Sequence, residues 1–137
     1  MKVYVFGNQD YEQDSTAYDV VEIIKLEPWY KEFELEFINV KQNEGLPFIG
    51  EKRVVILDVV KGINEIKLIM NDDIERLKLH DSSTVHDFDL AFQIMYLKKL
   101  KKLGDVIIIG IPFEGKIDYD SIHSIVKKLV AQDIQGS

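Results

Sequence analysis

Arg53–Asp58 has the sequence RVVILD, in which four consecutive apolar residues lie between an arginine and an aspartate. A second run of this kind is Asp105–Ile109 (DVIII), which leads directly into Gly110–Pro112. Strands of a parallel sheet are covered on both faces, so they are continuous rather than alternating apolar runs, rich in valine and isoleucine. These two segments therefore predict the central strands of a sheet that is buried on both faces.

Strand and helix patterns alternate along the rest of the chain. Phe33–Phe37 (FELEF) alternates apolar side chains with glutamates, which is typical of an edge strand with one solvated face. Residues 41–51 contain two glycines and a proline and predict a loop. Further strands are predicted at Val3–Phe6, Ile66–Met70 and Leu77–Leu79. Three helices are predicted: one that ends before Pro28, one from Ser83 or Thr84 to about Leu103, and one from Tyr119 to Gln132.

The spacing of apolar residues predicts which face each helix buries. Gly104 is expected to end the second, long helix. The predicted buried faces are Ala17, Val20, Val21 and Ile24 in the first helix, Phe88, Ala91, Phe92, Met95, Leu100 and Leu103 in the second, and Ile122, Ile125, Val126, Leu129 and Val130 in the third.

Alternating strands and helices predict βαβ crossovers, and so the α/β class. The expected architecture is a three-layer α/β/α, doubly wound, hydrolase-like fold with a mostly parallel sheet. Residues 1–137 are expected to form a single domain, because a chain of this length buries a substantial core and contains no linker-like stretch.

The composition limits the classes of function. The chain contains 24 acidic and 17 basic residues, and a net charge of −7 is unfavourable for binding nucleic acid phosphates. The absence of cysteine excludes disulfides, thiolate metal sites and a cysteine nucleophile. No apolar run approaches the roughly 20 residues that span a bilayer, and no signal peptide is recognisable, so a cytoplasmic protein without membrane insertion is expected. The basic run Lys98–Lys102 is expected to be a solvated helix end.

Three residues that can bind a metal follow predicted strands. Asp14 comes after the first strand, Asp58 ends the RVVILD run, and His86 lies in the first turn of the long helix. The carboxyl ends of parallel strands meet at one edge of a sheet, so loops distant in sequence can form one site there. Two carboxylates and an imidazole are a suitable ligand set for a divalent transition metal. Asp10 and Glu12 lie near Asp14 in the sequence and can replace it.

Each of these residues also has a structural interpretation. Asp14 is suited to cap the helix that follows it, and taken alone this is its stronger interpretation. Asp58 can equally accept hydrogen bonds from amides of a following turn. A charged histidine is unfavourable near a helix N-terminus, so His86 is expected to be neutral and available as a ligand or proton carrier. His80 and His123 are expected to be surface residues.

Other catalytic and binding motifs do not fit the chain. The serines before His86 do not form a Gly-x-Ser-x-Gly elbow, which argues against a serine hydrolase. Gly7-Asn8 is not followed by the glycines of a P-loop or a dinucleotide fingerprint. A response-regulator receiver has a similar size, but it requires a lysine after its last buried strand, where this chain has Gly110–Phe113.

Four segments resemble the hydrogenase maturation endopeptidases, which trim the C-terminal extension of a nickel-containing hydrogenase large subunit. The resemblance covers nearly the whole chain. The matching segments are Val5–Asn8 with Asp14, Val55–Asp58 with Gly62 shortly after, Ser83–Asp87 with its Ser-x-His pattern at a helix start, and Ile107–Pro112 with its Gly-Ile-x turn.

The resemblance implies a metal-dependent endopeptidase that acts on a hydrogenase large-subunit precursor. Asp14, Asp58 and His86 would be its metal-contacting and catalytic residues. The implied metal is nickel, supplied by the substrate, and zinc, cobalt or cadmium can substitute for it. The expected partner is the precursor, and the protein is expected to be a monomer.

The chain departs from the family pattern around Asp14. The family usually has Asp-Asp/Glu-Gly-x-Gly there, whereas Gln13–Ala17 reads QDSTA and contains no glycine. Glycines allow a substrate backbone to approach closely. Their absence motivates a second hypothesis, a non-catalytic binding or chaperone protein on the same scaffold that engages a metal-loaded maturation partner.

Overall fold

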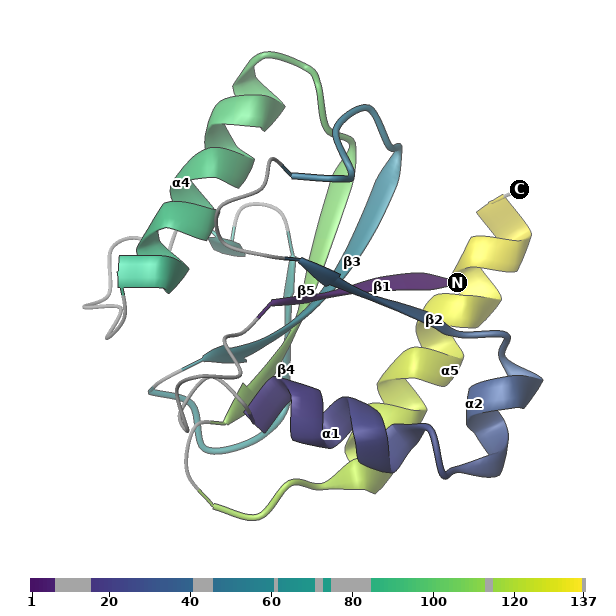
Figure 1. Cartoon of the computed structure of the whole chain (residues 1–137). Coiled ribbons are helices and arrows are strands. Elements are labelled where there is room, and N and C mark those ends of the chain that lie inside the picture. Colours follow the sequence, from purple (N-terminus) through teal and green to yellow (C-terminus); the bar gives the residue numbers. More distant parts are fainter. Residues whose placement is uncertain are drawn as a thin grey trace.

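The computed structural model describes residues 1–6, 16–40, 46–60, 62–70, 73–74, 85–112 and 115–136, without the side chains of residues 85–91 and 134–136. Strands and helices follow one another along the chain (Figure 1). Among the described helices, none combines the length and the apolar composition needed to cross a membrane. The elements are the strands β1 (Lys2–Phe6), β2 (Glu36–Val40), β3 (Arg53–Val60), β4 (Lys67–Met70) and β5 (Asp105–Pro112), and the helices α1 (Thr16–Ile24), α2 (Pro28–Glu32), α4 (Val85–Lys99) and α5 (Tyr119–Gly136).

The strands form one five-stranded mixed sheet in the order β2-β1-β3-β5-β4. Four strands run parallel, and β4 pairs antiparallel with β5. The two apolar runs that predicted central strands are β3 and β5, which pair with each other over eight residues. The predicted α/β class and mostly parallel sheet are therefore confirmed. The predicted strand at Leu77–Leu79 and the cap at Ser83 or Thr84 lie outside the described residues.

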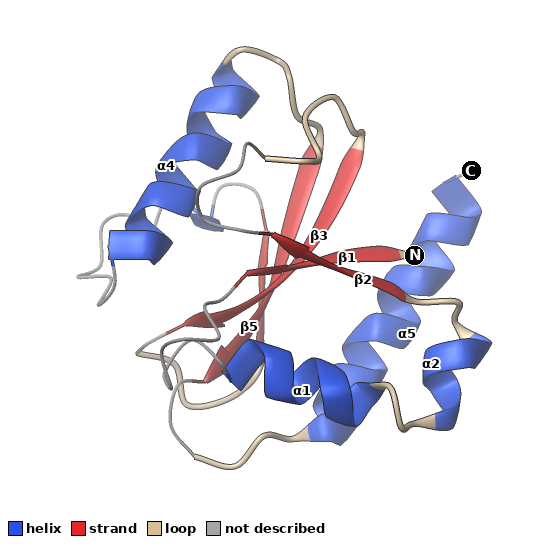
Figure 2. Cartoon of the chain, viewed as in Figure 1, coloured by secondary structure: helices blue, strands red, loops and turns tan. Residues whose placement is uncertain are grey.

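Helices cover both faces of the sheet and produce the predicted three layers. α1, α2 and α5 lie against one face, and α4 lies against the other (Figures 1 and 2). Successive side chains of a strand point to opposite faces, so β3 contributes to two cores. Val55 and Leu57 pack in the core under α1 and α5, whereas Val54 and Ile56 pack in the core on the α4 side.

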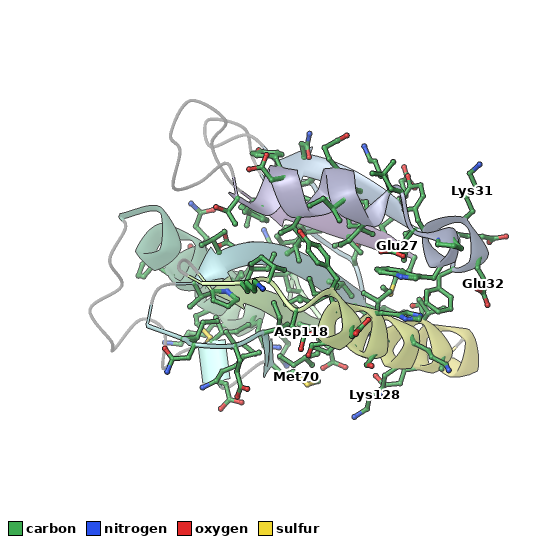
Figure 3. All side chains as sticks on the ribbon, turned by 90° about the horizontal axis from the view of Figure 1, so that it is seen from below. Glu27, Lys31, Glu32, Met70, Asp118 and Lys128 are labelled. Carbon is green, nitrogen blue, oxygen red and sulfur yellow. The ribbon has the colours of Figure 1, made fainter. Side chains whose placement is uncertain are left out.

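α1 buries the face that its apolar spacing predicted. Its four predicted inward residues are at most 3% exposed. Pro28, expected only to end this helix, instead occupies the first turn of the short helix α2, a position where proline is favoured because its missing amide has no partner to lose. α2 was therefore not predicted. Its outer side chains include Lys31 and Glu32, which point away from the body of the molecule (Figure 3).

The edge strand predicted at Phe33–Phe37 begins three residues later, as β2. Phe33 instead follows the last turn of α2 and packs beside Trp29 at a ring distance of 6.1 Å. Glu34 adopts a left-handed backbone conformation (φ 52°), and its carbonyl accepts a hydrogen bond from the amino group of Met1 at 3.0 Å. A contact with the N-terminus therefore fixes the turn into β2. The alternation of apolar and charged residues in this segment could not predict such a long-range contact.

The predicted buried face of α4 is wrong in part. Leu103 is buried as predicted, but Phe92 and Leu100 are 51% and 47% exposed. The helix instead buries Ile94, which is fully enclosed, and packs Leu97 against the same core. Apolar residues occur on all sides of α4, so their spacing does not select one face.

α4 ends at Lys99, whereas it was predicted to run to about Leu103 and to be ended by Gly104. The amide of Lys102 donates to the carbonyl of Leu97 at 2.9 Å, and the amide of Lys101 donates to that of Lys98 at 3.0 Å. This is a Schellman motif in which Lys101 takes the left-handed conformation (φ 58°) that glycine usually supplies. Gly104 serves another purpose, because a Cβ atom there would collide with the backbone carbonyl of Lys52.

α5 begins at an aspartate cap. Asp118 accepts hydrogen bonds at one oxygen from the amides of Asp120 and Ser121, at 3.1 and 3.2 Å, and at the other from the Ser121 hydroxyl at 2.9 Å. These bonds, chiefly those from Ser121, lower the pKa of Asp118. Asp118 lies at the start of the helix in Figure 3. The predicted inward residues of α5 are confirmed, since all five are buried or packed against the core.

A buried tyrosine connects β1 to the loop that precedes β3. The Tyr4 hydroxyl donates to a carboxylate oxygen of Glu51 at 2.7 Å. Burial, together with the nearby Glu51 carboxylate, raises the pKa of Tyr4 to about 12. Because an unfolded tyrosine titrates near pH 10, the folded state holds this proton more tightly than the unfolded state. The resulting stability is fully present below about pH 10 and is lost as the pH rises toward 12.

Tyr4→Phe should remove this alkaline dependence. The quantity to compare is the free energy of unfolding of wild type minus that of Tyr4→Phe. This difference should be constant below about pH 10 and should fall toward pH 12. The reason is that Tyr4, which is present only in wild type, gives up its proton more easily in the unfolded state than in the folded state. Denaturant titrations at several pH values measure the difference. Glu51→Gln should make the alkaline decrease smaller and end it at a lower pH, because it lowers the pKa of Tyr4 in the folded state and leaves that of the unfolded state unchanged. A difference that does not change with pH would contradict the assignment.

Candidate functional site

Asp58 lies inside β3 rather than after it. The strand continues through Val59 and Val60, so the prediction that Asp58 closes the strand is wrong. Both additional residues are apolar and buried, and they keep their pairing with Ile111 and Pro112 of β5. An aspartate alone does not end a strand whose pairing with a neighbouring strand continues past it.

Asp58 is nevertheless level with the carboxyl ends of β1 and β2. Val5 pairs with Leu57 on one side and with Asn39 on the other, so the next residues along these three strands are Phe6, Asp58 and Val40. Phe6 and Val40 are the last residues of their strands. Asp58 therefore occupies the row at which the connections after β1 and β2 begin. This is the edge where doubly wound sheets place their ligand sites.

Asp58 is the buried charged residue of the described part of the chain. It is 6% exposed, whereas every other buried side chain described there is uncharged. One of its carboxylate oxygens accepts a hydrogen bond from the amide of Val59 at 2.9 Å. This partner is its strand neighbour rather than a turn amide. A carboxylate offers about four acceptor sites, so this bond is compatible with binding a cation as well.

Gly110 lies opposite Asp58 in the register of β3 and β5. A Cβ atom at Gly110 would come within 3.3 Å of methyl groups of Val60, Ile63 and Ile69. Side chains from three segments therefore close over the glycine and form an apolar wall beside the carboxylate. The sequence indicated Gly110 only as part of a turn, because its relation to Asp58 depends on the register between strands.

His86 is the second residue of α4. α4 leads into the amino end of β5 through residues 100–104, so its first turn lies toward the carboxyl edge of the sheet (Figure 1). By strand alternation Asp58 shares a face with Ile56 and Val60, and this is the face that α4 covers. The helix start and the aspartate thus belong to the same side and the same end of the sheet. The side chain of His86 lies outside the described residues.

Asp14 also lies outside the described residues, as do Asp10 and Glu12. The elements on either side of it are Phe6, at the end of β1, and Thr16, at the start of α1. Within the described ranges, no three carboxylate or imidazole side chains are close enough to hold a metal ion. Because two members of the predicted triad lack described side chains, Asp14, Asp58 and His86 as a metal site remain a prediction.

The other two histidines were predicted to be surface residues. His80 lies outside the described part of the chain. His123 is half-buried, because its ring stacks on Trp29 at 4.9 Å with 7° between the planes and lies 5.8 Å from the ring of Phe33. It therefore belongs to an aromatic cluster between α2 and α5 and is remote from the Asp58 face. The apolar spacing of α5 did not reveal this role, since the stacking partners come from another helix.

A hollow of about 390 Å³ lies between α1 and the edge strand β2. Its walls combine charged and aromatic side chains, including Asp19, Glu22 and Phe37. It lies on the α1 side of the sheet, whereas Asp58 belongs to the α4 side. The hollow is therefore separate from the predicted metal site.

Solved structures with a similar fold include an endopeptidase and two hydrogenase maturation proteases. An endopeptidase from Escherichia coli, solved in solution, matches with a TM-score of 0.56 and 14% identity over 96% of this chain and 89% of its own. The hydrogenase maturating endopeptidase HybD from E. coli matches with a TM-score of 0.55 and 13% identity over 99% and 91%. A hydrogenase 3 maturation protease matches with a TM-score of 0.52 and 21% identity over 93% and 87%. At these identities the likeness shows the fold.

A comparison of the sequence with protein families identifies the family to which the chain belongs. Curated proteins yield no match to this chain. The sequence profile of the hydrogenase maturation proteases matches residues 35–135, which is well over half of the chain and includes β3, α4 and β5. Both the profile and the fold agree with the resemblance found in the motifs around Asp58 and His86. The chain belongs to the hydrogenase maturation protease family.

Proposed function

We propose that the protein is an endopeptidase that removes the C-terminal extension of a nickel-loaded hydrogenase large-subunit precursor. Membership of the maturation protease family supports a peptidase. The observation that supports a cation-directed reaction is the position of Asp58, buried on a central strand and level with the carboxyl ends of β1 and β2. Burying a carboxylate is unfavourable. A functional role explains better than a structural role why Asp58 is buried where no other charged side chain of the described residues is buried.

In this proposal Asp14, Asp58 and His86 together contact the nickel ion of the substrate. Carboxylate and imidazole ligands suit nickel, zinc and cobalt, and cadmium is a further substitute. The cation would polarise the scissile carbonyl or activate a water molecule. β3 is held by β1 on one side and by β5 on the other, so the sheet fixes the position of the Asp58 backbone. Asp87 or a backbone carbonyl would fix the tautomer of His86.

The metal in this proposal belongs to the substrate rather than to the free enzyme. The protein has no cysteine nucleophile and no Gly-x-Ser-x-Gly elbow, so a cation that arrives with the precursor would activate water as the nucleophile or polarise the scissile carbonyl. It also makes the reaction conditional, since a precursor without nickel would present no ion to the three ligands. The enzyme would then act only after the metal has been inserted.

The second candidate is a non-catalytic binding or chaperone protein that engages the same metal-loaded partner. The QDSTA sequence of Gln13–Ala17, in place of the glycines usual in the family, favours it. Both candidates predict binding of the nickel-loaded precursor. Only the peptidase predicts that the bound precursor is cleaved.

Incubation of the purified protein with nickel-loaded and nickel-free precursor tests the proposal. Mass spectrometry should show loss of a C-terminal peptide from the nickel-loaded precursor and none from the nickel-free precursor, because the ligands lack a cation in the second case. Binding without cleavage would favour the chaperone. Equal cleavage of both precursors would refute the nickel requirement while leaving the peptidase.

A further inference from the structure

Large apolar side chains are exposed along the outer face of α4. Phe92, Tyr96 and Leu100 are 51%, 56% and 47% exposed. They follow one another at intervals of four residues, which places them in one row on the helix surface. The opposite side of α4 already supplies its contact with the sheet through Ile94. The outer row therefore lies on the side of the helix that faces away from the sheet.

A fourth exposed apolar side chain lies near the end of this row. Ile49 is 52% exposed, and the next residue, Gly50, donates its amide to the carbonyl of Lys102 at 2.8 Å. We call Ile49, Phe92, Tyr96 and Leu100 the α4 patch. In the described part of the chain, four of the seven exposed large apolar side chains belong to it. Such clustering marks an interaction surface, whereas single exposed apolar residues are ordinary.

The patch has a basic rim in an acidic protein. Residues 90–104 contain four lysines and no acidic residue, although the chain as a whole has a net charge of −7. Lys99, Lys101 and Lys102 are exposed, while Lys98 donates to the carbonyl of Gly104 at 3.0 Å. The complementary surface is apolar at its centre and bears carboxylates at its edge.

We propose that the α4 patch is the docking surface for the folded body of the hydrogenase large-subunit precursor. This inference rests on the proposed function, because it takes the precursor as the partner. Phe92 and Tyr96 lie on the same helix as His86, and Leu100, directly after this helix, is 14 residues beyond His86, or about 21 Å along the axis at 1.5 Å per residue. A precursor held at the patch would thus need at least about six extended residues to reach the Asp58 edge.

A second copy of the chain is a poorer occupant. Four half-exposed side chains bury much less than the roughly 800 Å² per partner of a stable interface. Two copies, each with a charge of −7, also repel one another. An enzyme must release its product, so a small docking surface that combines with the contacts of the site suits a substrate better than a permanent partner.

Charge substitutions in the patch test the proposal. Leu100→Glu and Tyr96→Glu should raise the KM for the nickel-loaded precursor roughly tenfold or more and leave kcat unchanged, because each places a carboxylate at the centre of an apolar contact. Lys101→Glu should raise KM most at low salt. The matched control is Leu26→Glu, since Leu26 is 85% exposed and follows α1 on the other side of the sheet. Its KM should equal that of wild type.

The outcomes separate this inference from the proposed function. If wild type cleaves the precursor and Leu100→Glu has the same KM, the docking surface is refuted and the peptidase stands. If wild type binds the precursor without cleaving it and Leu100→Glu no longer binds, the peptidase is refuted and the docking surface stands. If wild type neither binds nor cleaves, both fail. A dimer in sedimentation, or binding to anionic vesicles, that Leu100→Glu abolishes without affecting KM would assign the patch to another occupant and overturn the inference.

Discussion

Replacing Asp58 by asparagine should abolish cleavage of the precursor and leave the fold intact. Asparagine has nearly the same shape, and its amide oxygen can still accept the hydrogen bond from Val59. It carries no charge and is a poor ligand for a hard or borderline cation. Changes outside the ligand shell of a metal site already cost about 10- to 100-fold in activity, so loss of a ligand should cost at least about 100-fold.

The thermal stability of Asp58→Asn separates a functional from a structural role. If Asp58 serves chemistry, removing a buried charge should leave Tm unchanged or raise it. If Asp58 serves the fold, the same substitution should lower Tm. Asp118→Asn is the matched control, because Asp118 is an exposed helix cap at which asparagine is equally favoured. Full activity in a folded Asp58→Asn protein would exclude Asp58 from the site.

The central sheet could be predicted because its strands carry a signal that does not depend on distant contacts. β3 and β5 are continuous apolar runs, and such runs have few stable environments other than the middle of a covered sheet. The amphipathic helices α1 and α5 were predicted with their buried residues for a similar reason. In each, most apolar residues occupy one face, so their spacing predicts which side is buried.

Other features depended on contacts between remote segments. The start of β2 is set by hydrogen bonds between Met1 and residues 34 and 36. Gly104 is required because the backbone of Lys52 passes close by. In α4, apolar side chains cover both the inner and the outer face, so Phe92 and Leu100 satisfied the spacing of a core face without belonging to it. The buried face of α4 could not be predicted because the helix also has exposed apolar side chains, which are those of the α4 patch.

The sequence could single out Asp58 as a candidate site residue, but not its position within the sheet. The sequence identified Asp58 from its place after an apolar run, although β3 continues beyond it. Its alignment with the ends of β1 and β2, and its position opposite Gly110, follow from the register of three strands. Register is fixed by the whole sheet, and no local pattern contains it.

Phe48 links this edge of the sheet to the core, although it lies in a turn. It is fully buried, and its ring meets Tyr4 and Phe6 edge-on at 5.1 and 6.3 Å. Phe6 ends β1 in the row that contains Asp58. A turn residue therefore fills the space on the α4 side of the sheet next to the predicted site, where a helix or strand would normally supply the packing.

Phe48→Ala should be the most destabilising of the substitutions considered. Removing a fully buried phenylalanine costs about 3 to 5 kcal/mol, because the transfer free energy and the contacts lining the cavity are both lost. Because the Phe48 ring also forms edge-to-face pairs with two other rings, the loss of stability should lie toward the upper end of that range. Phe48→Leu should cost less, since it leaves a smaller cavity. Phe92→Ala, at a half-exposed position on α4, is the matched control and should cost about 1 kcal/mol or less. Denaturant unfolding of the three variants gives these differences, and a Phe48→Ala protein as stable as Phe92→Ala would show that the turn does not support the sheet.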